Sequence, residues 1–432
     1  MTIAQELMKA YLESLDDQLA TEVSDKHSVV NRQSRTINFC FGPVTFQRRY
    51  YQGLGFYLDH HLKIKPRRRL SAYLRLMMAK LGQVTTMRNA AMALNLLFDS
   101  GISANSVMEA IHELGSAVAT RTKQNEAQVR DRQVPHHLVI EGDALEIKVQ
   151  DSRKAIAHNS MVHHYQIYEV ERNDDGQYQH LHRHDFFSLG HHEALKARIS
   201  DYLNCHYRLE GQTIFLGSDA GPGYEPAAML ELVPALAHGE YVVDRYHCLK
   251  KIRATMRDQP ALMERAIRAV RQYDQDQITV ALDTYESIAQ ATGDVARLRA
   301  YLKRNWPYLS SPKQRHHSEF GHLGTIESTH RAITYRMKKQ GKRWSTTGAQ
   351  TMIALLESRT NDQLDDLINQ VLRQVTALPQ DLVNFDSKIS IRVRDYLRPT
   401  AFRQSCGAAQ GAIYLDAATS SPMGRLAKIY NA

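Results

Sequence analysis

The sequence predicts an α/β fold in which a mixed β-sheet carries helices on both faces, and two observations support this. From Pro135 three strand-like segments follow one another, at residues 137–150, 161–172 and 178–190. Helices and strands then alternate, with helical patterns at 192–207 and 225–236 and strand patterns at 212–219 and 240–247. Three antiparallel strands followed by alternating helices and strands are typical of a ribonuclease-H-like core.

The region before this core, residues 1–134, is predicted to hold an N-terminal amphipathic helix, a β-hairpin and further helices. Alternating apolar residues flank the turn dipeptide Gly42-Pro43, and the hairpin's outer faces are expected to carry Arg35, Arg48 and Arg49. Helical patterns follow at 70–83, 85–99 and 103–124. Their outline resembles a DNA-binding helix-turn-helix, although ordinary helical hairpins share it.

The remaining boundaries follow from where strands stop. Residues 135–248 are predicted to form the first part of the core, and residues 249–318 an all-helical insertion without strands. A helix that begins near Gly324 places residues 319–362 back in the core. Residues 363–432 are expected to form a helical and irregular C-terminal tail.

Charge favours a polyanionic partner. The 432 residues carry a formal net charge of +9 with a pI near 9.2. Two basic clusters, at residues 63–69 and 336–343, contribute to this charge. Solvated surface charge would explain either cluster alone, whereas the two together favour nucleic acid. The predicted DNA contacts are Lys63, Lys65, Arg67, Arg68, Arg69, Arg336, Lys338 and Lys339.

Cysteine spacing and hydropathy bear on whether the protein has disulfides, a cysteine zinc site, a signal peptide or a membrane span. The four cysteines lie far apart without a CxxC pair, so neither a disulfide framework nor a cysteine zinc site is expected. No signal peptide and no apolar run of membrane-spanning length is recognised. We therefore expect a cytoplasmic, nucleoid-associated protein without a membrane partner.

Carboxylates at strand ends predict a metal site. Asp143 lies in an apolar strand on the same face as Glu141, and Asp219 ends the fourth strand, which this topology places beside the first. With Glu327, which opens a later helix, they would hold two Mg²⁺ ions, or Mn²⁺ as a substitute. Glu141 and Glu146 compete with Asp143 for the role. Asp219 could instead form an Asx turn, and Glu327 could be an ordinary first-turn acid.

A second motif is the D-x-x-H formed by Asp244 and His247 at the end of the fifth strand. These residues could support the metal-bound carboxylates, with Asp244 orienting the imidazole of His247. The alternative is an N-cap by Asp244 with a surface histidine.

Four stretches in order, "EGDALEIKVQ", "GSDAGPGYE", "VVDRYHCLKKI" and "GTIESTHRAITYRMKKQGKRWSTTGAQTM", give the chain a resemblance to the ISLre-two family of insertion-sequence transposases. That resemblance implies a DDE transposase whose catalytic triad is Asp143, Asp219 and Glu327, with Asp244 and His247 matching a further signature. Ala144 stands where the family usually has glycine, and Trp344 matches a family tryptophan.

The resemblance implies cleavage at element ends and attack of the released 3′-hydroxyl on target DNA, without a nucleotide cofactor. The expected partners are double-stranded DNA and further copies of the chain, as a homodimer or higher oligomer. Arg331, one helical turn beyond Glu327, is expected to contact a phosphate. Two alternatives stay open, a catalytically idle transposase-derived DNA-binding protein and a ribonuclease-H-like nuclease without strand transfer.

Overall fold

The computed structural model describes residues 2–98, 100–128, 132–150, 157–288, 292–321, 323–339 and 341–375. The described chain divides into two compact units, one formed by residues 2–35 and 46–66 and the other by residues 36–45 and 67–375. The predicted boundaries at 134, 248, 318 and 362 stay predictions. Most of the predicted tail, from residue 376 onward, lies outside the described residues.

The first unit contains an N-terminal helix, most of a hairpin and a short helix: α1 (Ile3–Val23), β1 (Val29–Phe39), β2 (Gly42–Tyr51) and α2 (Tyr57–His61). A capping box between Thr2 and Gln5 begins α1. The expectation of outward arginines is wrong for Arg35 and Arg48, which are buried and form ion pairs with buried Asp59. A buried cation needs such a partner to offset its lost hydration.

Three helices open the second unit: α3 (Ala72–Val84), α4 (Met87–Leu97) and α5 (Ala104–Glu126). Each begins with a hydroxyl side chain that accepts a hydrogen bond from a first-turn amide, and these N-caps are Ser71, Thr86 and Ser103. Such caps satisfy amides that have no partner within the helix. Gly115 of α5 lies against the backbone of Thr351, so that a Cβ at this position would meet the Thr351 carbonyl oxygen.

The predicted mixed sheet is confirmed. Its five strands lie in the order β5-β4-β3-β6-β7, with β3, β4 and β5 antiparallel and β6 and β7 parallel to β3. Their bounds are His137–Val149, His158–Arg172, Tyr178–Leu189, Thr213–Ser218 and His238–Val243 for β3 to β7. Two local expectations are corrected, because α7 covers only Pro226–Leu230 and because β7 ends before Asp244.

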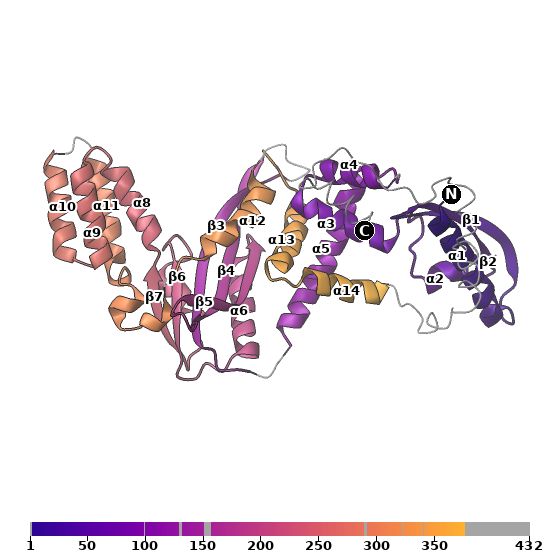
Figure 1. Cartoon of the computed structure of the whole chain (residues 1–432), viewed down its shortest axis with the longest axis horizontal. Helices are drawn as coiled ribbons and strands as arrows, with labels where there is room; N and C mark the ends of the chain where they lie inside the picture. The colour runs from indigo at the N-terminus through magenta and orange to yellow at the C-terminus, as the bar shows by residue number, and fades with distance from the viewer. Residues whose placement is uncertain are drawn as a thin grey trace, which may run out of the picture. The chain divides into compact units, whose positions relative to one another are not determined.

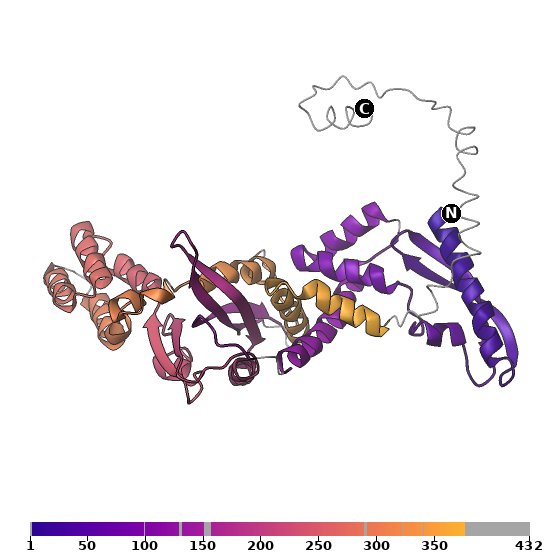
Figure 2. The ribbon, with the colours of Figure 1, turned by 60° about the horizontal axis from the view of Figure 1, so that its bottom comes forward.

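The two-residue period of β3 divides its side chains between two layers. Leu138 and Ile140 pack with helix α6 (His192–His206) in one buried cluster. Leu145 and Ile147 point to the other face, in a cluster that includes Ile333 of α12 (Ile326–Ile333). Figure 2 shows α6 and α12 on opposite sides of the sheet. Odd-numbered positions of β3, Asp143 among them, therefore face α12.

The helices after β7 extend the first of these clusters, since buried residues such as Cys248, Ile267 and Leu302 belong to it. They are α8 (Arg245–Thr255), α9 (Pro260–Gln272), α10 (Gln275–Ile288) and α11 (Thr292–Asn305), which gather together in Figure 1. After α12, a π-helical turn (η4, Thr334–Lys338) leads to α13 (Thr346–Thr360) and α14 (Leu364–Val375). None of the helices described is long and apolar enough to cross a bilayer.

Candidate active site

Three aspartates occupy one row across three neighbouring strands. Gly142 of β3 pairs with Ser218 of β6, and Ser218 pairs with Val243 of β7. The next residues along these strands are Asp143, Asp219 and Asp244, and the amide of Asp244 donates to the Ser218 carbonyl at 2.7 Å. All three line one pocket, which Ile326 at the start of α12 also lines. The structure thus confirms that the strands carrying Asp143 and Asp219 are adjacent.

Asp219 forms the Asx turn that was one of its two predicted roles, and it also lines the pocket. Its Oδ1 accepts a hydrogen bond of 2.7 Å from the Gly221 amide, which is an Asx turn. Ala220 and Gly223 in the same loop have positive φ angles of 57° and 83°, a conformation that glycine adopts without strain. The turn fixes the loop after β6 while Asp219 still lines the pocket.

Asp143 has the most perturbed carboxyl group of the row. Its side chain is 19% exposed, and its pKa is raised to about 7, chiefly by burial and further by the charges of Asp219, Glu327 and Asp244. The neighbouring negative charges oppose the ionisation of Asp143, and a bound cation would reverse that effect. A pocket of carboxylate oxygens therefore fits a divalent cation such as Mg²⁺ or Mn²⁺.

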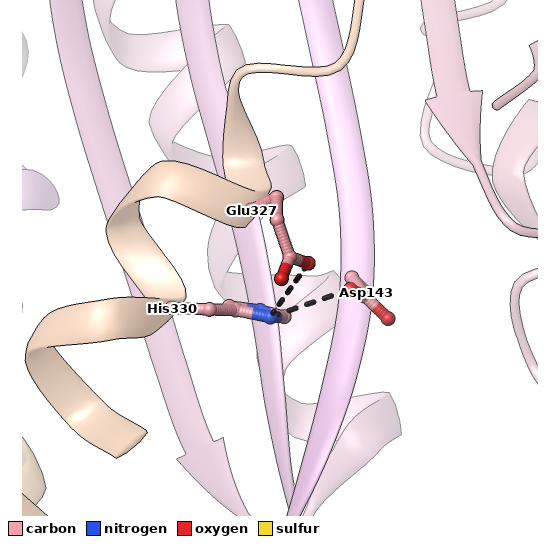
Figure 3. Close-up of side chains that lie close together, drawn as sticks. All are labelled: Asp143, Glu327 and His330. Carbon is pink, nitrogen blue, oxygen red and sulfur yellow. Dashed lines mark ion pairs between the residues drawn. The ribbon is translucent and has the colours of Figure 1, made fainter. Parts of the chain in front are cut away.

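Helix α12 brings Glu327 to the same place, together with a histidine that was not among the predicted site residues. The Nδ1 atom of His330 lies 3.3 Å from Oδ2 of Asp143 and 3.9 Å from Oε2 of Glu327. Figure 3 shows the imidazole and the Glu327 carboxylate extending from α12 toward Asp143 on β3. Burial, with nearby His164 adding to it, lowers the pKa of His330 to about 3, so its ring is neutral. The i, i+3 spacing of Glu327 and His330 places the two side chains close together on a helix, and this spacing was the sequence signal that could have pointed to His330.

Glu141 is not a competitor of Asp143, because it has a different partner. It is buried, and it accepts hydrogen bonds from the amides of Gly324, Thr325 and Ile326, the latter two at 2.9 Å. These amides precede or begin α12, where a helix has no internal acceptors. Glu141 therefore anchors the helix that carries Glu327. The other competitor, Glu146, is exposed and accepts from Asn159.

The D-x-x-H motif lies at the start of a helix rather than inside a strand. Asp244 is the N-cap of α8 and accepts from the Tyr246 amide at 2.8 Å. The Nε2 atom of His247 lies 3.8 Å from Oδ2 of Asp244. Burial raises the pKa of Asp244, and the charge of Asp219 adds to this effect. Asp244 thus caps a helix and also shares the electrostatic field of the acidic pocket.

Most of the predicted DNA contacts lie at the surface, with two differences. Arg68 forms paired hydrogen bonds of 2.9 Å with the Glu113 carboxylate. Arg336 is 2% exposed and donates to the Gly82 carbonyl, and burial lowers its pKa to about 10. The prediction for Arg336 is therefore corrected, because a guanidinium held inside the protein cannot meet a phosphate. The exposed members are Lys63, Lys65, Arg67, Arg69, Arg331, Lys338 and Lys339.

The fold and the site together define an α/β protein with a mixed five-stranded sheet and an acidic pocket where its central strands and one helix meet. The chain belongs to the family described as "Uncharacterised protein family (UPF0236)", whose model matches residues 1–369. It is 27% identical over 425 residues to the "UPF0236 protein in vanSb 3′ region" of Streptococcus gallolyticus, covering 96% of this chain and 91% of that protein. A UPF0236 protein of Caldanaerobacter subterraneus is 19% identical over 368 residues, covering 82% and 74%.

Proposed function

We propose that this protein is a metal-dependent DNA transposase of an insertion sequence, of the DDE type and the ISLre-two kind, built on a ribonuclease-H-like core. The observation that carries the proposal is the position of Asp143, which lines one pocket with Asp219 and whose carboxylate lies within 4.8 Å of ligand atoms of Glu327 and His330 on α12. Acids from separate elements gathered around one carboxylate resemble the ligand arrangement that two-metal phosphoryl transfer requires.

The carboxylates of Asp143, Asp219 and Glu327 would hold the Mg²⁺ or Mn²⁺ ions. Bound there, the ions supply an activated nucleophile and neutralise charge on the leaving oxygen. The protein's own residues would orient the DNA and support the ligands. Asp244 would hold the ring of His247 toward the site, and cations beyond Glu327 would contact phosphates. These cations are Arg331, Lys338 and Lys339, all exposed.

Phosphoryl transfer between DNA strands replaces one phosphodiester with another, so the proposal needs no nucleotide cofactor. The partners would be double-stranded element ends and target DNA. The basic run at Lys63, Lys65, Arg67 and Arg69 would bind the ends, and a homodimer or higher oligomer would hold two ends together. Such a protein would act at the nucleoid in the cytoplasm.

The test uses the full-length protein with DNA taken from both flanks of its coding region, where short inverted repeats would mark the element ends. Labelled flanks are incubated with Mg²⁺ or with EDTA in the presence of a supercoiled target plasmid. Metal-dependent nicking at the repeats and covalent joining to the plasmid are the expected products. Cleavage without joining would indicate a nuclease instead, and end binding without cleavage an idle DNA-binding protein.

A further inference from the structure

We infer that His330 is a nitrogen ligand of the divalent cation bound by Asp143 and Glu327, and that the site therefore prefers Mn²⁺ to Mg²⁺. The inference rests on the proposed function only in assuming that the acidic pocket binds a divalent cation. It adds a ligand to the predicted triad and changes the expected metal.

The first support is the position of the ring. One ligand atom each from Asp143, Glu327 and His330 lies within 4.8 Å of the others, which is within the reach of one ion. The imidazole is buried, with a side chain that is only 9% exposed. Figure 3 shows Nδ1 directed at both carboxylates. A ring nitrogen aimed between two acids can offer its lone pair where a cation would lie.

The second support comes from the residue behind the ring. His164 Nε2 lies 2.8 Å from Oδ1 of Asp185, with both side chains fully buried. If that nitrogen donates its proton to the carboxylate, Nδ1 of His164 is left as an acceptor. This Nδ1 and Nε2 of His330 both lack a hydrogen-bond partner among the described residues, and the two rings are 5.0 Å apart between centroids.

These two unpaired nitrogens are complementary. When His330 carries its proton on Nε2, its Nδ1 offers the lone pair that a metal requires, and Nδ1 of His164 is an acceptor on a neighbouring ring, although no hydrogen bond joins the two nitrogens in this structure. Metal-bound histidines in proteins usually donate their other ring nitrogen to an acceptor that fixes the tautomer. Asp185 is in turn held by Gln166, whose Nε2 lies 2.7 Å from it and 3.0 Å from Thr329 Oγ1 of α12.

A nitrogen ligand changes the metal preference. Mg²⁺ takes oxygen ligands and keeps its waters, whereas first-row transition ions accept imidazole nitrogen readily. Mn²⁺ also suits carboxylates. A site with carboxylate oxygens and one imidazole therefore selects Mn²⁺ over Mg²⁺.

The experiment loads the full-length protein with Mn²⁺ in the absence of DNA and records pulsed electron paramagnetic resonance. We expect modulation from a directly bound ¹⁴N nucleus, replaced by the ¹⁵N pattern when histidine is labelled. His330→Asn should abolish the nitrogen signal and weaken Mn²⁺ binding on the order of tenfold or more, since even outer partners of metal ligands are worth 10–100-fold. Mg²⁺ binding, measured by competition, should change less.

His247→Asn is the matched control, because His247 is a second histidine near the acids, beside Asp244, and should leave the nitrogen signal intact. If His330→Asn does not fold, the labelled wild-type spectrum still shows whether a histidine binds the ion, and the His247 variant shows whether that histidine is His247. Mn²⁺ bound without nitrogen coupling, or coupling lost in His247→Asn, would overturn the inference while leaving the proposed function standing. Failure to bind either ion would overturn both.

Discussion

The amide of Thr325 donates a hydrogen bond of 2.9 Å to Oε2 of Glu141, and the Thr325 hydroxyl lies 2.9 Å from the same oxygen. The neighbouring amides of Gly324 and Ile326 donate to the same carboxylate. Glu141 stands two residues before Asp143 on β3, and Glu327 stands two residues after Thr325. This buried anchor therefore helps to place Glu327 near Asp143.

Glu141→Gln should loosen helix α12. The glutamate offers acceptor oxygens to donors from Gly324, Thr325 and Ile326, whereas glutamine turns one of these oxygens into a donor. At least one buried amide then loses its partner, which costs about 1–3 kcal/mol in the free energy of unfolding. Urea denaturation measures the loss, and metal affinity should fall as well because Glu327 and His330 shift.

Glu146→Gln is the control on the same strand, with an exposed side chain. It should leave the free energy of unfolding unchanged. If Glu141→Gln were equally silent, the anchoring role of Glu141 would have to be withdrawn.

Asp143→Asn, Asp219→Asn and Glu327→Gln should each abolish DNA cleavage and leave binding to element ends largely intact. Each change removes a ligand charge while keeping the shape of the side chain. Cleavage assays and gel-shift titrations on the same preparations separate the two effects. Activity that survives in one variant removes that residue from the triad.

Asp244 permits its two roles to be separated. Asn is as good an N-cap as Asp, so Asp244→Asn should keep the melting temperature, whereas Asp244→Ala should lose about 1 kcal/mol of stability. If the charge of Asp244 orients His247, Asp244→Asn should slow cleavage even though α8 stays capped. His247→Ala should slow it by roughly 10–100-fold and leave Mn²⁺ binding measurable by calorimetry. Wild-type rates in both variants would reduce the pair to a helix cap.

DNA binding should fall steeply with salt concentration. Changing Lys63, Lys65, Arg67 and Arg69 together to glutamine should flatten the log-log slope by about 0.9 for each phosphate that these side chains neutralise in the wild type. Arg68→Gln should leave the slope unchanged, because Arg68 is engaged with Glu113. A slope that stays the same in the fourfold variant would show that these four side chains are solvated surface charges that do not contact DNA.

A buried ionic cluster should make stability depend on pH. Arg198 of α6 donates to Glu126 of α5, at 2.6 Å, and to Glu357 of α13. Burial alone would raise the pKa of Glu126, but hydrogen bonds from His184 and Arg198 outweigh it and lower that pKa. A lowered folded-state pKa contributes stability that is present above the unfolded value, about 4.3, and lost as pH falls through the folded value.

Arg198→Met should therefore destabilise the fold at pH 7 by about 3–5 kcal/mol, since it removes the cation that two buried carboxylates share and leaves Glu126 with His184 and Glu357 with the Phe187 amide. The difference from wild type should shrink toward about pH 4 as Glu126 takes up a proton. Denaturation at both pH values measures it. Arg299→Met, at a more exposed ion pair, is the control and should change little. An effect of equal size at both pH values would contradict the electrostatic account.

The position of Asp143 beside Asp219 was predictable because it depends on the two-residue period of a strand and on parallel strand pairing, which apolar patterns reveal. Asp143 and Asp219 were placed on adjacent strands from the order of segments alone, and the structure pairs those strands. Glu327 was chosen as the third acid because it opens a helix at a recognisable boundary. These are local signals, readable without knowing what packs where.

The anchor and the extra histidine were missed for a different reason. Nothing near Glu141 indicates that amides more than 180 positions later supply its hydrogen bonds. His330 comes close to Asp143 only because α12 packs over β3, and this packing cannot be read from the local sequence. Arg336 was predicted to contact DNA because it belongs to a basic cluster. The π-helical turn at Thr334–Lys338 includes this position, and the guanidinium lies inside, against Gly82 and over the Trp344 ring.

The carboxylate of Glu141 ties the start of α12 directly to β3, so a contact outside the connecting chain holds Asp143 and Glu327, the first and last acids of the proposed triad, near each other. Helices α8 to α11 lie in the part of the chain that connects these two acids. Closing a longer or shorter loop changes free energy only slowly with its length. These helices could therefore be lengthened, shortened or replaced during evolution without changing the arrangement of the acids. Such changes would fit the proposed transposase to new DNA ends.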